Sequence, residues 1–476
     1  MTPTRLIAYS ALPGADSRSY QSVRIWPMSR VERFALGRRL RQDVPRGWLG
    51  EWRRPDTRSD PVAQIQRSHE GRIASLIPIR IGRMVSSPYG FLRGASDVMT
   101  SDLASLPATG ITPVICGDAH LGNFGFYASP ERELVLDLND FDEAHPGPWE
   151  WDLRRLVTSI WVAGRQNGSR ESQCEDAVMS CVAAYRHSVR VLANQPLLTR
   201  SFQRMDAGLL QTTVTGKSLR ATVARAAKLA RARTSDRALP RFTTERSGHR
   251  HIVEKAPLII RVPKATSQRI AAAVDQYLGT LAPHWRRIVG GYTLIEVAHK
   301  VVGVSSVGLR SYVALLEGSS PDDVLFLQLK EARRSVVARY VHGEVPRHAH
   351  QGQRVVEYQQ AVQTVSDPLL GWTTIDGLPY YVRQFRDMKG TIPLNAIKAG
   401  ALTDYARIVG LLLAKGHART SGASMIAGYV GSSQRLDEAM GRFARAYADQ
   451  IEADHDALVR GVARGSVPAL RRRQGE

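Results

Sequence analysis

Two polar residues in the first third of the chain have the types and the spacing of a catalytic pair. Asp118 and Asn123 are separated by four residues and follow the apolar run ITPVIC (111–116), which predicts a buried strand. A carboxylate and a carboxamide at this spacing can point into one cleft from a tight loop. The Asp can accept or orient a hydroxyl proton, and the Asn can hold a divalent ion through its oxygen.

Further carboxylates follow a short predicted β segment, ELVLDL (133–138). Asp140 can take a second position on the same ion, and Asp142 is a third candidate ligand two residues later. Carboxylates crowded in this way repel one another unless a cation lies between them. A Mg²⁺ ion held by Asn123, Asp140 and Asp142 would cancel that repulsion.

The elements that must position these residues fall into three stretches. Up to about residue 285 the pattern is mainly helical, with amphipathic helices expected at 149–166 and 174–193 and further helices at 95–106 and around 265–281. Strands are suggested at 251–262. Alternating β-type runs follow Gly290, interrupted by one helix at 352–365, and the chain is helical again from Leu402. Residues 1–70 are rich in Arg, Pro and Ser with weak periodicity, and we expect a loosely structured basic extension there.

The string GDAHLGNFGFY…LNDFDEA resembles the catalytic core of protein-kinase-like phosphotransferases, where the loop H-[RG]-D-x-x-x-x-N precedes a metal-binding Asp of a D-F-G or D-F-D segment. It is most similar to the small-molecule branch, the aminoglycoside and choline kinase-like enzymes. The resemblance implies that Asp118 is the catalytic base and that Asn123 and Asp140 bind Mg²⁺. It also implies that Asp152, in WEWDL, supports the loop. Cys116 departs from the motif, which usually has His at that position.

A kinase-like enzyme also needs a β-rich nucleotide lobe with a glycine-containing loop, a strand Lys and a helix Glu. We expect the loop at VVGVSSVG (301–308), where a plain hairpin is the alternative. We expect the Lys in LFLQLKEA (325–332), where an exposed strand Lys is the alternative, and the next predicted helix carries a Glu in the right order to pair with it. The strand and hinge whose backbone would hold adenine fit YYVRQFRD (380–387). The residues expected to contact the nucleotide are Gly303, Ser305, Ser306, Gly308, Lys330, Glu357, Arg383 and Gln384.

The order of these parts is rotated relative to ordinary kinases, in which the nucleotide lobe precedes the catalytic loop. GLLLAKGHART (410–420) resembles the helix that ordinarily comes before that loop. We therefore expect an α+β, two-lobed kinase-like fold that is circularly permuted, with a helical lobe at 71–285, a nucleotide lobe at 286–392 and completing helices at 393–476. The alternative takes 95–106 as the pre-loop helix and the β-rich region as an unrelated insertion.

The chain as a whole resembles the bacterial family called domain of unknown function 2252, over residues 70–460. The resemblance rests on the strings FLRG, CGDAHLGNFGFYASPER, DLNDFDEAHPGPWEWDLRRL, KVVGVSSVGLR, LQLKEA, VRQFRDMKG and AYADQ. The family name supplies no function, so the expected mechanism depends on the residues.

Three further basic residues are candidates for substrate binding. Arg386 and Lys389 lie just beyond the expected hinge, where a salt-bridged turn is the plainer alternative. Arg93 is the third candidate, with an exposed structural Arg as its alternative. The basic cluster at 217–250 is either a solvated helix face or an anion-facing patch. It lacks the interleaved aromatic residues of a single-strand binder, so nucleic acid is a possible partner but is not favoured.

Composition limits the class of protein. The 476-residue chain has 65 Lys and Arg against 44 Asp and Glu, and its net charge of +21 favours anionic partners. No run approaches the roughly 18 uninterrupted apolar residues of a membrane helix. The N-terminus lacks the pattern of a secretory signal, and three cysteines cannot form a disulfide framework. These features indicate a cytoplasmic protein; they leave its oligomeric state open.

The predicted function is phosphoryl transfer from ATP, with Mg²⁺ as the second cofactor, to a hydroxyl-bearing acceptor that is a small molecule rather than a protein. Nucleotidyl transfer on the same fold is one alternative, and a non-catalytic nucleotide-binding pseudokinase is the other. The intact set of Asp118, Asn123 and Asp140 argues against the pseudokinase, which has no need to keep all three residue types.

Overall fold

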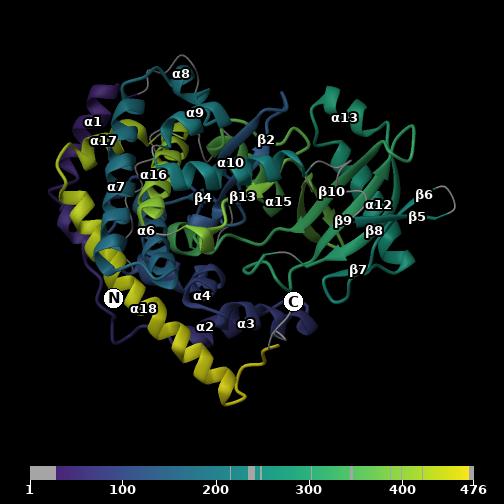
Figure 1. Ribbon diagram of the computed structural model, residues 1–476, viewed down its shortest axis with the longest axis horizontal. Coiled ribbons are helices and arrows are strands. Elements are labelled where there is room, and N and C mark those ends of the chain that lie inside the picture. The colour runs from purple at the N-terminus through teal and green to yellow at the C-terminus, as the bar shows by residue number, and fades with distance from the viewer. Residues whose placement is uncertain are drawn as a thin grey trace.

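The structure, a computed structural model, describes residues 28–470 except 215, 234–241, 247–248, 302, 344–346, 386, 398 and 421. It is mixed α+β, as expected, and a helical part lies beside a six-stranded sheet (Figure 1). None of the helices within the described ranges combines the length and the apolar character that crossing a bilayer requires.

The six-stranded sheet is antiparallel, with the order β11–β12–β10–β9–β8–β7. Leu325, Leu327 and Leu329 of β10 pack with helix α12 (Lys264–Leu278) on one face. Their alternate neighbours Gln328 and Lys330 therefore point to the opposite face. The strands are β7 (Ile259–Arg261), β8 (Thr293–Lys300), β9 (Ser311–Glu317), β10 (Val324–Glu331), β11 (Gly371–Ile375) and β12 (Leu378–Gln384).

The six-stranded sheet and the helix that covers it begin before residue 286, where we expected the nucleotide lobe to start. Strand β7 forms the edge of the sheet beside β8, and α12 covers one of its faces. The chain from Ile259 onward therefore belongs with the sheet. The local pattern of this segment predicts strands and a helix but does not indicate which sheet they join.

Short strand pairs bring the Asp118 loop and the Asp140 segment together. β1 (Val114–Ile115) ends directly before the loop and pairs with β4 (His145–Pro146), which follows the Asp140 segment. β2 (Phe124–Ala128) and β3 (Leu134–Leu138) form the hairpin between the two segments. β13 (Gly390–Thr391) pairs with β2 and so connects the chain leaving β12 to this hairpin.

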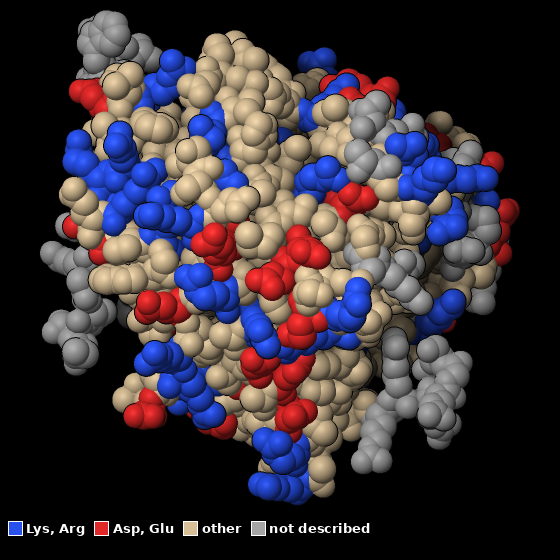
Figure 2. Space-filling model, turned by 60° about the vertical axis from the view of Figure 1, so that its left-hand side comes forward, with Lys and Arg blue, Asp and Glu red and all other residues tan. Residues whose placement is uncertain are grey.

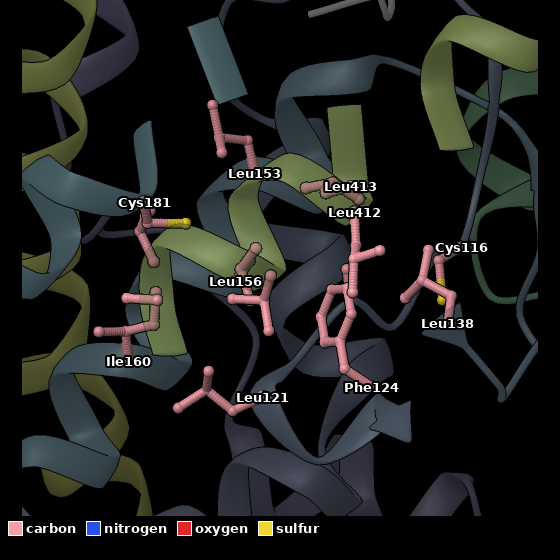
Figure 3. Packing of buried hydrophobic residues seen from close by; sticks show 14 of the residues in the cluster. Cys116, Leu121, Phe124, Leu138, Leu153, Leu156, Ile160, Cys181, Leu412 and Leu413 are labelled. Carbon is pink, nitrogen blue, oxygen red and sulfur yellow. The ribbon is translucent and has the colours of Figure 1, made fainter. Parts of the chain in front are cut away.

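The helical part packs around α6 (Trp149–Gln166), most of whose residues are buried. Helices α7 (Glu171–Ala193), α16 (Ala399–Arg419) and α18 (Arg435–Ala463) contact it. Figure 3 shows Leu153 and Ile160 of α6 in one apolar cluster with Leu412 of α16 and Leu121, which follows Asp118 in the loop. The loop thus rests directly on the core of the helical part.

Other elements complete the described ranges. Short 3₁₀ helices span Arg46–Gly50, Ala74–Leu76, Leu121–Asn123 and Leu394–Ala396, and a hairpin consists of β5 (Thr243–Arg246) and β6 (His249–Ile252). The further helices are α1 (Arg30–Arg39), α2 (Pro61–Arg67), α3 (Ile77–Val85), α4 (Pro88–Gly94), α5 (Ser96–Ala104), α8 (Leu197–Ser201), α9 (Ala207–Thr213), α10 (Lys217–Arg231), α13 (Pro283–Val289), α14 (Ala338–His342), α15 (Gln351–Val362) and α17 (Ala423–Val430).

The prediction of a loosely structured extension at 1–70 is wrong for residues 28–70, the part of it that the structure describes. Helix α1 packs against α17, and Arg41 Nε donates to the backbone oxygen of Tyr429 at 2.8 Å. Arg58 bridges two buried carboxylates, Asp102 at 2.8 Å and Asp454 at 2.6 Å. The arginines that suggest a solvated segment in the sequence are the groups that attach it to the helical part.

Candidate active site

The loop that carries Asp118 is anchored by Asp152 of helix α6. The backbone N–H groups of Cys116 and Gly117 donate to the two carboxylate oxygens of Asp152, at 2.7 and 2.9 Å. His417 Nε2 lies 3.3 Å from the same carboxylate, and the Tyr185 hydroxyl lies 2.8 Å from His417 Nδ1. Because all five residues are buried, this network fixes the start of the loop. Asp152 thus connects helix α6 to the start of the loop.

Two further residues of α6 hold the rest of the loop and were not anticipated from the sequence. Arg155 Nε donates to Asp118 Oδ1, and Ser159 Oγ accepts the N–H of Leu121 at 3.1 Å. Asp152, Arg155 and Ser159 are spaced by three and four residues, so they share one face of the helix. The spacing of these three polar residues along one face of the helix is the signal that could have revealed them.

Replacing Asp152 by Ala is expected to lower the free energy of unfolding by about 2–6 kcal/mol, because two buried N–H groups lose their acceptor at about 1–3 kcal/mol each. Urea unfolding of the variant and the wild type measures the difference. Asp322→Ala is the control, since that side chain is 85% exposed and its loss should cost less than about 0.5 kcal/mol. Equal losses in the two variants would contradict the anchoring role of Asp152.

The carboxylate of Asp118 is suited to accept a proton. Burial raises its pKa to about 6, and the charge of Asp140 acts in the same direction, although Arg155 and Arg93 oppose the shift. His120 Nε2 lies 4.0 Å from Asp118 Oδ2, but burial holds the pKa of His120 well below its ordinary value, so this ring is neutral. A carboxylate with a pKa near 6 can accept a proton at neutral pH.

Asn123 and Asp140 lie together beside Asp118. Asn123 Nδ2 donates to the backbone oxygen of Asp118 at 2.7 Å, which leaves its side-chain oxygen for a cation. The Asp140 segment touches the loop through Cys116 Sγ, 3.1 Å from the backbone oxygen of Asp140. Oδ1 of Asp140 is buried without a hydrogen-bond partner. Burial raises the pKa of Asp140, and the neighbouring charge of Asp142 adds to the shift.

Asp142 differs from Asp140 because its carboxylate is already paired. Lys330 Nζ lies 2.8 Å from Asp142 Oδ2, and the Tyr381 hydroxyl donates to Oδ1 at 2.7 Å. Burial would raise the pKa of Asp142, but Lys330 and the Tyr381 hydroxyl hold it below its ordinary value. Of the two carboxylates, Asp140 is therefore the one with an oxygen available to a metal.

The available donors fit Mg²⁺. Within the described ranges, no three His, Cys, Asp or Glu side chains gather into a metal site of their own. The donors here are an amide oxygen and the unpaired oxygen of Asp140, with Asp142 adjacent. Mg²⁺ commonly takes one or two carboxylates and fills its other positions with waters and substrate phosphates. The unpaired, buried oxygen of Asp140 is the feature that favours a cation at this place.

The prediction that Lys330 pairs with Glu357 is wrong: the ion pair of Lys330 is with Asp142. The Glu357 side chain is exposed, and its carboxylate accepts from Gln353 Nε2 at 2.7 Å and lies 2.9 Å from His348 Nε2. Helix α15 instead reaches the Asp140 segment through Arg354, which is buried and donates to the backbone oxygen of Asp142 at 2.7 Å. Asp142 approaches Lys330 from the loop and takes the place expected for the helix Glu.

Three cations of the β-rich part face the two carboxylates. Lys330 and Arg383 lower the pKa of Asp140, against the effect of burial. Arg383 Nε is fixed by Gln328 Oε1 at 3.1 Å. Burial and the charge of Arg383 hold the pKa of Lys389 well below its ordinary value, as expected of a cation among other cations.

Two other residues were predicted in this region, Arg386 and Gln384. Arg386 lies outside the described residues. Gln384 ends β12, and its backbone N–H donates to Asp367 Oδ2 at 2.6 Å. The turn that follows carries Asp387, whose carboxylate pairs with Arg132 at 2.5 Å, so a salt-bridged turn is present at this point.

The glycine-containing loop at 301–308 lies against the N-terminal helices. Gly303 and Gly308 have φ values of +70° and +89°, which glycine adopts without strain. Arg72 Nη1 donates to the backbone oxygens of Ser305 at 2.7 Å and Val307 at 2.6 Å. The backbone angles of the turn therefore account for glycine at these two positions. Arg72, which lies outside the loop, holds its backbone in place.

One cavity joins these parts. It has a volume of about 600 Å³, and Asp118, Asp140 and Asp142 line it together with Ser305 and Ser306 of the glycine-containing loop. The Asp118 loop, the Asp140 segment and the glycine-containing loop therefore lie around one space.

The basic cluster at 217–250 has the features of a solvated helix face in its described part. Helix α10 turns Leu219, Val223 and Ala230 inward and contacts α16 and β13, whereas its Lys and Arg side chains are exposed. On the face turned forward in Figure 2, Lys and Arg are interspersed with Asp and Glu rather than gathered in one basic surface.

Comparison with known proteins gives a family and no further relatives. The family model described as an uncharacterised protein conserved in bacteria, DUF2252, matches residues 72–461. No curated protein and no solved structure matches the chain. The matched range contains every residue placed at the site above.

Proposed function

We propose that this chain, which belongs to the DUF2252 family, transfers the γ-phosphoryl group of Mg·ATP to a hydroxyl group of a small acceptor molecule. The observation that carries the proposal is the ion pair between Lys330 Nζ of β10 and Asp142 Oδ2, at 2.8 Å. It joins residues 188 positions apart in the chain. We take Lys330 as the nucleotide-lobe Lys, and Asp142 lies in the segment of Asp140, the proposed metal ligand.

Each group has a role that follows from its surroundings. Asp118 orients the acceptor hydroxyl and takes its proton as the acceptor oxygen bonds to the γ-phosphorus and the bond to the β–γ bridging oxygen breaks, with ADP leaving. Asn123 and Asp140 would hold Mg²⁺, which neutralises charge on the phosphates. Lys330 and Arg383 supply fixed positive charge. Catalysis would come mainly from positioning and from electrostatic stabilisation.

A circularly permuted kinase-like fold explains the chain order and is part of the proposal. In chain order, strand β7, helix α12 and the β8–β9 hairpin precede β10, which carries Lys330. Helix α15 and then strands β11 and β12 come after it, and β12 pairs with β10. At the other end, the N–H of Val114 donates to Thr420 Oγ1 at 3.1 Å, directly after α16. The end of α16 thus lies where an unpermuted chain would continue into β1, and such rearrangement is tolerated where chain ends lie close together.

The test is the use of ATP labelled in the γ or the α position, incubated with Mg²⁺ and a small-molecule extract. The expected result is transfer of γ label only, and a loss of about 10²–10³-fold in Asp140→Asn, which removes the unpaired metal ligand. Asp322→Asn, at an exposed position, is the control and should transfer label as the wild type does.

Other outcomes reject the proposal in different ways. Transfer of α label would indicate nucleotidyl transfer on the same site. Absence of transfer from either position, together with no binding of Mg·ATP by calorimetry, would reject both kinds of group transfer.

A further inference from the structure

The cavity beside Asp118 is lined by arginines, here called the arginine wall, that phosphoryl transfer from ATP does not require. Six arginines line the cavity together with seven carboxylates, and three of the arginines come from the N-terminal segment that precedes the Asp118 loop in the chain. Serines from α5 and from the glycine-containing loop add hydroxyl groups to the lining. The arginines are Arg67, Arg72, Arg80, Arg333, Arg334 and Arg339.

Arg80 is the clearest sign that a ligand belongs here. Its side chain is 2% exposed, and Nη2 donates to the backbone oxygen of Gly94 at 2.8 Å. Its Nε and Nη1 atoms have no hydrogen-bond partner, and none of the described carboxylates forms an ion pair with it. Buried guanidinium nitrogens without hydrogen-bond partners are costly even with the charge of Asp97 nearby, so an anion from outside the chain would satisfy them.

Neighbouring arginines act on the charge of Arg80 and on one another. Burial lowers the pKa of Arg72 to about 9, and the charges of Arg80 and Arg333 contribute to that shift. Burial lowers the pKa of Arg80 to about 10, with Asp97 opposing and Arg333 adding. Like charges that depress one another inside a protein are typical of an anion site without its anion.

We propose that this wall binds a phosphate group of the acceptor, so that the acceptor is a small hydroxyl-bearing phosphorylated molecule. The inference that the phosphate belongs to an acceptor rests on the proposed function. Guanidinium groups match the oxygens of phosphate in pairs, which gives both affinity and orientation. A cavity of about 600 Å³ accommodates a molecule of metabolite size. With its phosphate on the arginine wall, such a molecule can present a hydroxyl to Asp118 across the same space.

Calorimetric titration of the full chain with inorganic phosphate tests this proposal. We expect binding to the wild type and a loss of at least about tenfold in affinity for Arg80→Gln. Arg154→Gln is the matched control, because Arg154 is equally buried, donates only to the backbone oxygen of Leu49 and does not line the cavity. Its phosphate affinity should stay within about twofold of the wild-type value.

If Arg80→Gln does not fold, a second variant still allows the phosphate titration to test the proposal. Arg67 lines the cavity from an exposed position, so Arg67→Gln should fold normally and weaken phosphate binding by about threefold. Absence of phosphate binding to the wild type, or equal binding by wild type and both cavity variants, would overturn the proposal.

Repeating the titration with saturating Mg²⁺ and a non-hydrolysable ATP analogue identifies the source of the phosphate. Unchanged phosphate affinity supports an acceptor site, whereas competition assigns the wall to the nucleotide and overturns the proposal. If the analogue does not bind while phosphate binding still depends on Arg80, the anion site stands and the phosphotransferase proposal fails.

Discussion

Replacing Asp118 by Asn is expected to lower kcat for phosphoryl transfer about a thousandfold, while the dissociation constant of Mg·ATP stays within about threefold of the wild-type value. The Asn has nearly the same shape and can still accept a hydrogen bond from Arg155, which contacts Asp118 Oδ1. The fold of the loop is therefore kept and only the proton acceptor is lost. Single-turnover transfer and calorimetric binding of Mg·ATP measure the two quantities separately.

The pH dependence provides a second measurement of the same role. Burial raises the pKa of Asp118 to about 6, so the carboxyl is protonated in acid and cannot take the proton of the acceptor. We expect kcat/KM to rise with pH through about 6 and then to level off. The residual activity of Asp118→Asn should lack this rise. If the variant keeps the inflection, another group such as Glu143, whose pKa burial raises to about 7, causes it and Asp118 is not the base.

The local parts of this site were predictable because their signals lie within short segments. Helix α6 has the predicted bounds, since its apolar periodicity is continuous from Trp149 to Gln166. The position of Asp152 under the loop follows from the motif. Arg155 and Ser159 were missed because a polar residue in a helix ordinarily indicates a solvated face, and here residues 149–164 of the helix are buried on every side.

The contacts that join distant segments were not predictable in the same way. Chain order suggested that Glu357 would pair with Lys330, but several carboxylates can approach a strand Lys, and only the packing of the loop against the sheet selects Asp142. Similarly, the segment around Arg58 lacks periodicity, so its attachment to Asp102 and Asp454 depends on partners that lie elsewhere in the chain. Periodicity reports local structure, whereas these contacts depend on the tertiary fold.

Replacing Lys330 by Met is expected to lower kcat/KM for ATP about a thousandfold and to lower the free energy of unfolding by about 3–5 kcal/mol. The loss of activity follows from removing fixed positive charge beside Asp140 and Asp142. The loss of stability follows because Asp142, whose side chain is only 24% exposed, would lose its ammonium partner. A single variant cannot separate these effects, since an unstable protein also loses activity.

The double variant Lys330→Met/Asp142→Asn separates them. Removing both charges should bring the free energy of unfolding back to within about 1 kcal/mol of the wild type, because a neutral Asn can still accept from the Tyr381 hydroxyl. Affinity for Mg·ATP should remain at the level of Lys330→Met. If affinity recovers with stability, the pair is structural and Lys330 does not bind the phosphates.

A second buried Lys–Asp ion pair, away from the proposed site, serves as the control for the effect of the Lys330 variants on stability and nucleotide affinity. Lys415 Nζ contacts Asp137 Oδ2, and both side chains are buried as deeply as that of Lys330. Lys415→Met should therefore destabilise the protein by a similar amount, and Lys415→Met/Asp137→Asn should restore much of the stability. In this control pair, Mg·ATP affinity should remain near the wild-type value at temperatures where the variant is folded. Recovery of stability in both double variants, with nucleotide affinity lost only in the Lys330 series, is the result that assigns Lys330 to the nucleotide.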